Sequence, residues 1–354
     1  MTDVQVCRRF CRVLIVAGFA LAALPVQFSL AQTPSQPDKK GSVGSVLDSI
    51  FGLKRETNGG GWLFAASKGD GEGGVYLAIS KDGYNWTFVN DGRPVIKETA
   101  KGELMRDPFM QRGPDGVMRL IWTWSKEGAP PAIGYSTSFD LLHWAEHRKL
   151  LLTAAIPGAL TTTAPAMYYD LAKKQWIILW TSVAAPGGKD SAPAERIYSA
   201  TTTDFKQFAP AKVYFDPGYN VADATVVSAS ATTQQYGLLF QDERTKPLEE
   251  RIHMAGGKAL EGPWQVSGGP ISEGWAEAPA AIPVDDGLLV YYHHFHDPQA
   301  YSASFTKDME HWTDVTLKTT FPGGMRHGSF VHITEDEYNM LKDYYVHNDT
   351  QLEK

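Results

Sequence analysis

A strand-rich unit recurs five times along the chain and limits the folds open to it. The unit has two extended apolar stretches followed by Ser or Thr, an acid and an aromatic residue, with a weaker copy at residues 255–267, and it recurs at intervals of roughly fifty to sixty residues. The aromatic residues of the copies are Trp86, Trp144, Phe208, Trp264 and Trp312. Short strands separated by turn residues at such an interval are typical of a β-propeller. The repeat therefore predicts an all-β fold, a five-bladed β-propeller.

The order of strands within the repeat predicts how the ring closes. The candidate inner strands are RDPFM, APAMYYD, DATVVSA, EAPAAIPV and HGSFVHI. The body of the chain begins with outer strands (GGWLFAAS, GVYLAIS, NWTFV) and ends on the inner strand HGSFVHI. We therefore expect the N-terminal strands to complete the last blade together with the C-terminal strand, which hides the sheet edges. A β-sandwich with several Greek keys is the structural alternative.

The N-terminal segments are expected to lie outside the propeller. Residues 1–31 combine a basic start, a short apolar run and the small-residue sequence SLA, which favours a secretory signal peptide over an uncleaved membrane anchor. Residues 32–58 are rich in Ser, Gly, Pro and Lys and are interpreted as a flexible linker. Both cysteines, Cys7 and Cys11, lie in the signal segment, so disulfides and cysteine-bound metals are excluded from the mature chain. We expect a secreted or periplasmic protein.

We assign residues 59–335 to the propeller and 336–354 to a C-terminal helix and tail. Thr334 is a candidate N-cap of that helix, with Glu337 three residues later. The formal net charge of the whole chain is −7, which disfavours nucleic acid and anionic membrane surfaces as partners. After signal removal we expect a monomer with no membrane contact.

Ionisable residues stand at the start of four of the five candidate inner strands. They are Asp107, Asp223, Glu277 and His327, whereas the remaining strand begins at Ala164. Inner strands of a propeller run side by side along the central channel, so their first residues surround one mouth of it. Because an unpaired buried carboxylate is costly, acids placed on such apolar strands predict a site.

Three carboxylates and an imidazole, without metal-ligand spacing or a Ser-His pair, fit hydrolysis of a glycosidic bond. One carboxyl group donates a proton to the leaving oxygen, and a second activates water or attacks the sugar. Crowded like charges raise one pKa, which provides an acid that stays protonated near neutral pH. Calcium binding is the competing use of three acids. Calcium loops place their acids close together in sequence, and these are far apart, so catalysis is favoured.

Several motifs in collinear order resemble glycoside hydrolase family 43. They are RDPFM, FDPGYNVADATVV, FQDER, ALEGPW, WAEAP, YYHHFHD and FPGGMRHGSFVHIT, and the similarity runs from about Trp62 to about Leu341. The resemblance is to the branches that act on arabinan and xylan side chains. It implies a five-bladed, inverting enzyme, similar to α-L-arabinofuranosidases and β-xylosidases. The implied substrate is an arabinose- or xylose-containing oligo- or polysaccharide of plant cell walls, and no cofactor is implied.

The resemblance also implies roles for individual residues. Asp107 matches the general base that activates water, Asp223 the acid that tunes and orients, and Glu277 the general acid. His327 matches a central histidine that in some relatives lies near a channel water or calcium, so a structural Ca²⁺ near His327 is the one metal considered. Arg244 matches an arginine on the substrate side.

Further substrate-binding candidates come from the residues themselves. Trp275 flanks the acidic cluster and is the better candidate for a sugar platform, and Arg106 precedes the first acid. The triplet His293, His294 and His296 does not suit a zinc site, because neighbouring strand residues point to opposite faces. One of these histidines is expected to line the pocket, and we select His294.

Two departures from the family pattern affect the functional prediction. Relatives read Trp-Ala-Pro-Glu at the second inner strand, where this chain has Thr163, Ala164, Pro165 and Ala166. Relatives also have Gly after the general acid, where this chain has Ala278. A catalytically impaired carbohydrate-binding propeller is therefore the alternative function. A sialidase-like hydrolase is a third hypothesis, which requires an arginine cluster and a Tyr-Glu pair.

Overall fold

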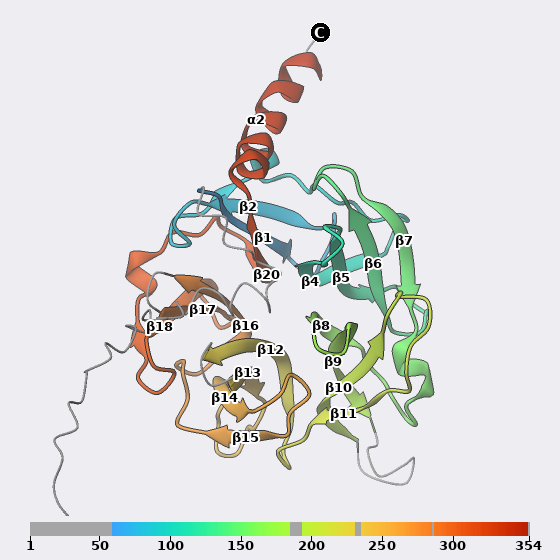
Figure 1. Ribbon diagram of the computed structural model, residues 1–354, viewed down its shortest axis with the longest axis vertical. Coiled ribbons are helices and arrows are strands. Elements are labelled where there is room, and N and C mark those ends of the chain that lie inside the picture. Colours follow the sequence, from blue (N-terminus) through green and yellow to red (C-terminus); the bar gives the residue numbers. More distant parts are fainter. Residues whose placement is uncertain (1–58, 185–192, 231–234, 285–286, 353–354) are drawn as a thin grey trace, which may run out of the picture. The chain divides into compact units, whose positions relative to one another are not determined.

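Five four-stranded antiparallel sheets form a ring in this protein (Figure 1). The computed structural model describes residues 59–184, 193–230, 235–284 and 287–352, so the predicted signal segment 1–31 and linker 32–58 lie outside the described residues. The inner strands of neighbouring sheets contact one another around the ring. The prediction of a five-bladed β-propeller is confirmed.

The blades are numbered from the one that holds the first strand. Blade 1 consists of β20 (Met325–Ile333), β1 (Gly61–Lys68), β2 (Tyr76–Ser80) and β3 (Thr87–Phe88). Blade 2 consists of β4 (Leu104–Arg112), β5 (Met118–Ser125), β6 (Ala132–Ser138) and β7 (Ala145–Leu150). Blade 3 consists of β8 (Thr163–Asp170), β9 (Gln175–Ala184), β10 (Ala194–Thr202) and β11 (Lys212–Phe215).

The remaining elements follow the same order. Blade 4 consists of β12 (Val221–Ser230), β13 (Gln235–Asp242), β14 (Arg251–Gly257) and β15 (Trp264–Ser267). Blade 5 consists of β16 (Ala276–Val284), β17 (Gly287–His294), β18 (Ala300–Thr306) and β19 (Thr313–Asp314). Short 3₁₀ turns are η1 (Asn90–Gly92), η2 (Leu152–Ala155) and η3 (Thr316–Lys318), and the α-helix is α2 (Glu335–Leu352).

Blade 1 joins two distant parts of the chain. β20 pairs antiparallel with β1, so that Phe330 lies opposite Phe64, and β2 pairs with the other side of β1. Both edges of β1 are therefore occupied by neighbouring strands, which satisfies its backbone hydrogen bonds. The predicted closure by the N-terminal and C-terminal strands is confirmed.

The repeated Ser/Thr and acid form a turn between the outer strands of the blades. In blade 1, Ser80 Oγ lies 3.0 Å from Asp82 Oδ1, and that oxygen also accepts the backbone N–H groups of Tyr84 and Asn85. Gly83 has φ of 78° there, a conformation that glycine adopts without strain. The same Ser/Thr-Asp contacts recur at Ser138–Asp140, Thr202–Asp204 and Thr306–Asp308. The sequence repeat thus reflects local capping of a turn.

Apolar side chains between adjacent sheets form the core. Phe64, on the central strand of blade 1, is fully buried and packs against the rings of Trp86, Phe321 and Phe330. Trp180 of β9 is likewise fully buried. Each sheet therefore hides its faces against its two neighbours, which fixes the inner strands around the channel.

Helix α2 follows the last inner strand. Its start has the predicted capping box, since the N–H of Glu337 donates to Thr334 Oγ1 at 3.2 Å and the N–H of Thr334 donates to Glu337 Oε2 at 2.9 Å. Glu337 also binds Arg112 of β4 at 2.6 Å. Within the described ranges, no helix combines the length and the apolarity needed to cross a bilayer.

Candidate active site

Every inner strand is irregular at the same place near its start. In blades 2 to 5, two residues of the inner strand lie opposite one residue of its neighbour, which is a β-bulge. The first bulge residue takes a positive φ, and His327 does so at the register shift in blade 1. These residues are Asp107 (49°), Ala164 (46°), Asp223 (54°), Ala278 (50°) and His327 (34°). The bulges turn five equivalent positions toward the channel.

Proline explains part of this local structure. Pro108, Pro165 and Pro279 each occupy the second bulge position in their strands. Proline lacks an N–H group, so it fits where the ladder of hydrogen bonds is already interrupted. The motif Asp-Pro at the start of β4 therefore marks the bulge that aims Asp107 inward.

The residues before the bulges form a second set of equivalent positions. Each pairs with one residue of the adjacent strand. The pairs, with the inner-strand residue first, are Arg106 with Thr123, Thr163 with Thr181, Ala222 with Gln241, Glu277 with His293 and Arg326 with Ser67. Cross-strand partners have side chains on one face of the sheet. His293 is thus placed beside Glu277 by the register of β16 and β17.

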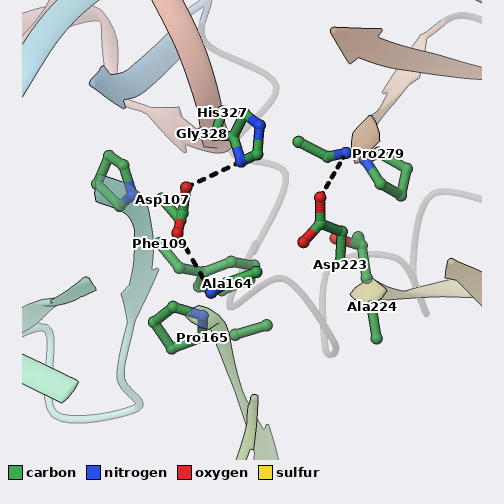
Figure 2. Close-up of a pocket in the computed structure, with 13 residues that line it drawn as sticks. Asp107, Phe109, Ala164, Pro165, Asp223, Ala224, Pro279, His327 and Gly328 are labelled. Carbon is green, nitrogen blue, oxygen red and sulfur yellow. Dashed lines mark hydrogen bonds and ion pairs between the residues drawn. The ribbon is translucent and has the colours of Figure 1, made fainter. Parts of the chain in front are cut away.

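His327 lies between two of the predicted catalytic carboxylates. Its Nδ1 atom is 2.8 Å from Asp107 Oδ1, and its Nε2 atom is 2.6 Å from Glu277 Oε1. Figure 2 shows the ring of His327 directed at Asp107 across the channel. One imidazole therefore connects a carboxylate of blade 2 with one of blade 5.

Asp107 is held by donors from two blades. Thr123 Oγ1 donates to Asp107 Oδ2 at 2.6 Å, and the backbone N–H of Ala164 donates to the same oxygen at 3.3 Å. Burial raises the pKa of Asp107, but the charge and hydrogen bond of His327 and the hydrogen bond of Thr123 outweigh burial, so the pKa lies below its ordinary value. Asp107 is ionised at neutral pH, as a general base requires.

The pKa of Asp223 is shifted in the opposite direction, above its ordinary value. Its Oδ2 atom accepts the backbone N–H of Ala278 at 2.9 Å (Figure 2). Burial, together with the negative charges of Glu277 and Asp107, raises the pKa of Asp223 to about 7 against the opposing charge of His327. Asp223 is therefore the member of the predicted triad that holds a proton most readily.

Glu277 is surrounded by nitrogen atoms. Its Oε1 atom lies 2.6 Å from His327 Nε2, 2.8 Å from His293 Nδ1 and 3.8 Å from Arg326 Nη2. Burial raises the pKa of Glu277, but hydrogen bonds from His293 and His327 overcome burial and lower it below the ordinary value. The paired carboxylates in turn raise the pKa of His327 well above its usual range, although burial acts against its charge.

These groups line two cavities of the channel, which share Asp107, Asp223 and His327. A cavity of about 250 Å³ at the mouth is lined by Asp107, Asp223, Glu277 and His327, and Arg106, Glu195 and Glu243 lie in its walls. Deeper in the channel, a space of about 30 Å³ is bordered by Asp107, Asp223 and His327 (Figure 2), enough for one or two water molecules. The upper cavity has the size and polarity of a site for a single sugar ring or a short glycan end.

The structure brings together five of the eight predicted site residues. Asp107, Asp223, Glu277, His327 and Arg106 all line the upper cavity.

The other three predicted residues lie outside its lining. Arg244 binds Asp242 at 2.7 Å and covers the ring of Tyr219, Trp275 packs against His296, and the ring of His294 contacts the His296 carbonyl oxygen at 3.1 Å. The strand alternation of β17 turns His293, not His294, toward Glu277.

Several residues in or beside the cavity were absent from the predicted site. His293 and Arg326 contact Glu277, Thr123 supports Asp107, and Glu195 and Glu243 line the cavity from blades 3 and 4. Cross-strand register identifies His293 and Thr123, but it requires knowing which residues pair. Glu195 lies on the third strand of blade 3 and Glu243 directly follows the second strand of blade 4, and no local motif marks them.

Three side chains of the site carry atoms that could bind a metal ion. Among the described residues, Glu277, His293 and His327 each offer a ligand atom within 4.8 Å of the others. These atoms already contact one another at hydrogen-bond distances, so an ion would have to separate them. Calcium takes six to eight oxygen ligands, whereas the space beside His327 offers only two carboxylate groups, Asp107 and Asp223. The carboxylates alone therefore do not make up a calcium site, and a structural calcium ion near His327 stays a prediction from the sequence.

The departures from the family pattern have visible effects at the site. Thr163 lines the upper cavity where relatives carry a tryptophan, so this wall is smaller and more polar. Ala278 has φ of 50°, a conformation that glycine adopts without strain and alanine does not. Its N–H nevertheless reaches Asp223, so the bulge geometry is retained.

Comparisons with known proteins agree on the type of fold. A family model described as a probable glycosyl hydrolase domain, related to glycoside hydrolase family 43, matches residues 61–339. No curated protein matches the chain.

Solved structures give the same result. One described as a glycoside hydrolase is 14% identical, with 75% of this chain and 92% of that chain covered and a TM-score of 0.54. A xylan β-1,4-xylosidase from Bacillus halodurans C-125 is 12% identical, with 78% of this chain and 58% of that chain covered and a TM-score of 0.53. An endo-1,4-β-xylanase from Bacteroides thetaiotaomicron VPI-5482 is 13% identical, with 76% of this chain and 92% of that chain covered and a TM-score of 0.50. At these identities the likeness establishes the propeller fold.

Proposed function

Because the chain belongs to the family of probable glycosyl hydrolase domains related to glycoside hydrolase family 43, we propose that it hydrolyses a glycosidic bond with inversion. The proposed substrates are arabinose- or xylose-containing glycans of plant cell walls, bound in the cavity at the channel mouth. The observation that carries this proposal is the arrangement of Asp107 and Glu277 on opposite nitrogen atoms of His327.

Asp107 is proposed to activate the attacking water. Its lowered pKa keeps it ionised, and the donors Thr123 and Ala164 fix its orientation. An imidazole ring with a contact on each side separates Asp107 from Glu277, which leaves more room than the about 5–5.5 Å between the carboxyl groups of retaining enzymes. This spacing supports inversion, because a water molecule must fit between the base and the sugar.

The leaving-group oxygen needs a proton from a second carboxyl group. The family resemblance assigns this role to Glu277, which has a suitable place in the cavity. Its lowered pKa opposes that role, because a general acid must be protonated at the working pH.

A panel of aryl arabinosides, xylosides and galactosides tests the proposed function. We expect turnover by the wild type on at least one pentoside and loss of turnover in Glu277→Gln. Proton NMR of the first product should show the anomer opposite to that of the substrate. Binding of glycans by the wild type without any turnover would instead support a catalytically impaired carbohydrate-binding propeller, the function that the loss of the Trp-Ala-Pro-Glu motif favours.

A further inference from the structure

The second strand of every blade, counted from the channel, carries a polar side chain at one equivalent position. This position lies opposite the residue before the bulge, and in the five blades it holds Ser67, Thr123, Thr181, Gln241 and His293. Each of these residues is at most 3% exposed. A buried polar group is costly unless it forms hydrogen bonds, so five such groups at one level of the ring indicate a supporting role behind the site.

Thr123 has a hydrogen-bond partner in each of two blades. Its Oγ1 atom is 2.6 Å from Oδ2 of Asp107 in its own blade and 2.9 Å from the backbone nitrogen of Ala164 in blade 3. A backbone N–H group can only donate, so Thr123 accepts from Ala164, and its own hydroxyl hydrogen is free to point at the carboxylate. The bond to Asp107 therefore has one direction, from the hydroxyl group to the ionised acid.

Ala164 closes this arrangement into a triangle. Its N–H group also lies 3.3 Å from Oδ2 of Asp107, and Figure 2 shows this contact between the inner strands of blades 2 and 3. The other carboxylate oxygen, Oδ1, faces His327 of blade 1 at 2.8 Å. The two oxygen atoms of Asp107 are therefore held from the two neighbouring blades, and Thr123 completes the side toward blade 3.

Thr181 shows the same position without a catalytic acid beside it. It accepts the backbone N–H of Asp223 in blade 4 at 3.1 Å, just as Thr123 accepts that of Ala164 in blade 3. The bulge residue of its own blade is Ala164, which has no carboxyl group to receive a hydroxyl hydrogen. The two threonines therefore share a bond between blades and differ in the bond to an acid.

The charged and titratable groups around Asp107 come from four strands. Arg106 precedes it on β4, His327 faces it from β20, and Asp223 and Tyr301 interact with its charge from β12 and β18. All four groups stay in place when the threonine hydroxyl is removed. A change in the titration of Asp107 in such a variant therefore reports the lost hydroxyl bond.

We propose that Thr123 is a positioning residue that links the base to blade 3. Its hydroxyl group holds Oδ2 of Asp107 against the bulge of β8 and so sets the orientation in which the base meets the attacking water. The inference rests on the proposed hydrolysis and adds a residue to it. Thr123 is 1% exposed and lies behind the carboxyl group, so it acts through Asp107 and does not touch the sugar.

Substitutions of Thr123 in the intact protein test this role. Thr123→Val keeps the shape of the side chain and removes both hydroxyl bonds, while the Ala164 N–H retains Asp107 as an acceptor. We expect kcat to fall by about 10–10²-fold with KM within about threefold of the wild type, because the base is misplaced and substrate contacts are kept. The acidic limb of the kcat/KM profile should move to higher pH by about one unit, because the ionised base loses a hydrogen bond. Thr123→Ser keeps the hydroxyl group and should restore both values.

Thr181→Val is the matched control, because it removes a bond between blades at a position without an acid. Urea unfolding should show a loss of stability similar to that of Thr123→Val, since each variant loses one such bond. The acidic limb of Thr181→Val should stay at the pH of the wild type. This contrast separates positioning of the base from support between blades.

Distinct results identify which proposal fails. An active wild type whose acidic limb moves equally in Thr123→Val and Thr181→Val, or is not restored in Thr123→Ser, would overturn the inference and leave the hydrolase function intact. A wild type that cleaves no glycoside would contradict the hydrolase function itself. If Thr123→Val does not fold, Thr123→Cys, with a weak donor in place of a strong one, should shift the limb in the same direction by less.

Carbon-13 NMR of labelled aspartate carboxyl groups provides a readout that needs no turnover. The signal that is missing in Asp107→Asn belongs to Asp107. The inference requires this signal to titrate at higher pH in Thr123→Val than in the wild type, and an unchanged midpoint would refute it.

Discussion

Glu277 and His293 face each other as paired residues of β16 and β17, with His293 Nδ1 2.8 Å from Glu277 Oε1. His293 is almost fully buried, so this contact is shielded from water. The pair shows how the sheet register, and not a local motif, completes the site. It also gives the first of four predictions.

Replacing His293 by Ala removes one of the two imidazoles beside Glu277. The pKa of Glu277 should rise, because a hydrogen bond that favours the ionised form is lost. Because the proposed function assigns the leaving-group proton to Glu277, the alkaline limb of the kcat/KM profile should therefore move to higher pH by about one unit. A shift of the acidic limb in its place would mean that Glu277 acts in its ionised form.

Replacing Asp107 by Asn removes the base that activates water. We expect kcat to fall by about 10²–10⁴-fold while the far-ultraviolet circular dichroism spectrum stays that of the wild type. Asp115→Asn is a matched control, because Asp115 lies on the surface and binds only Arg119 and nearby backbone. Activity of Asp107→Asn within a few-fold of the wild type would rule out Asp107 as the base.

The raised pKa of Asp223 predicts a pH dependence of stability. The group has a pKa of about 7 in the folded chain and an ordinary value of 3.8. Between these values the folded state keeps a proton that the unfolded state has released, so the free energy of unfolding should fall as pH rises through this window. Asp223→Asn should remove this part of the slope and leave the protein more stable than the wild type at pH 7. Urea unfolding at pH 4, 5, 6 and 7 measures both effects, and parallel curves for the two proteins would contradict them.

The left-handed conformation of Ala278 predicts a stabilising substitution. This conformation costs a non-glycine residue about 1–2 kcal/mol, whereas glycine pays about 0.5–1 kcal/mol of extra chain entropy on folding. Ala278→Gly should therefore raise the free energy of unfolding by about 0.5–1 kcal/mol. Ala280→Gly in the same strand is the control, because Ala280 is buried without a positive φ and its substitution should destabilise. Destabilisation of equal size in both variants would show that the bulge is not strained.

The fold could be predicted from the sequence because each copy of the repeat corresponds to one blade. Four copies encode their own turn through Ser or Thr, Asp and a residue with positive φ, so repeated local signals indicate the blades. The order of inner and outer strands then determines the closure of blade 1. Asp107, Asp223 and His327 were found because all three stand at the bulge of an inner strand.

The rest of the site could not be read from local patterns. His293 was passed over for His294 because alternation along a strand does not reveal which face is turned inward. Trp275 is close to Glu277 in sequence and Arg244 belongs to the motif FQDER, yet their side chains pair with His296 and Asp242. Glu243 owes its raised pKa to burial and to charges from three blades, and only folding brings these charges together.

The attachment of β20 to β1 has a consequence for biosynthesis. His327 belongs to a strand that is synthesised after the strands of the other four blades, and that strand docks against β1, which is synthesised before them. Until β20 arrives, Asp107 and Glu277 have no shared cation between them. The charged centre is thus assembled only when the ring closes.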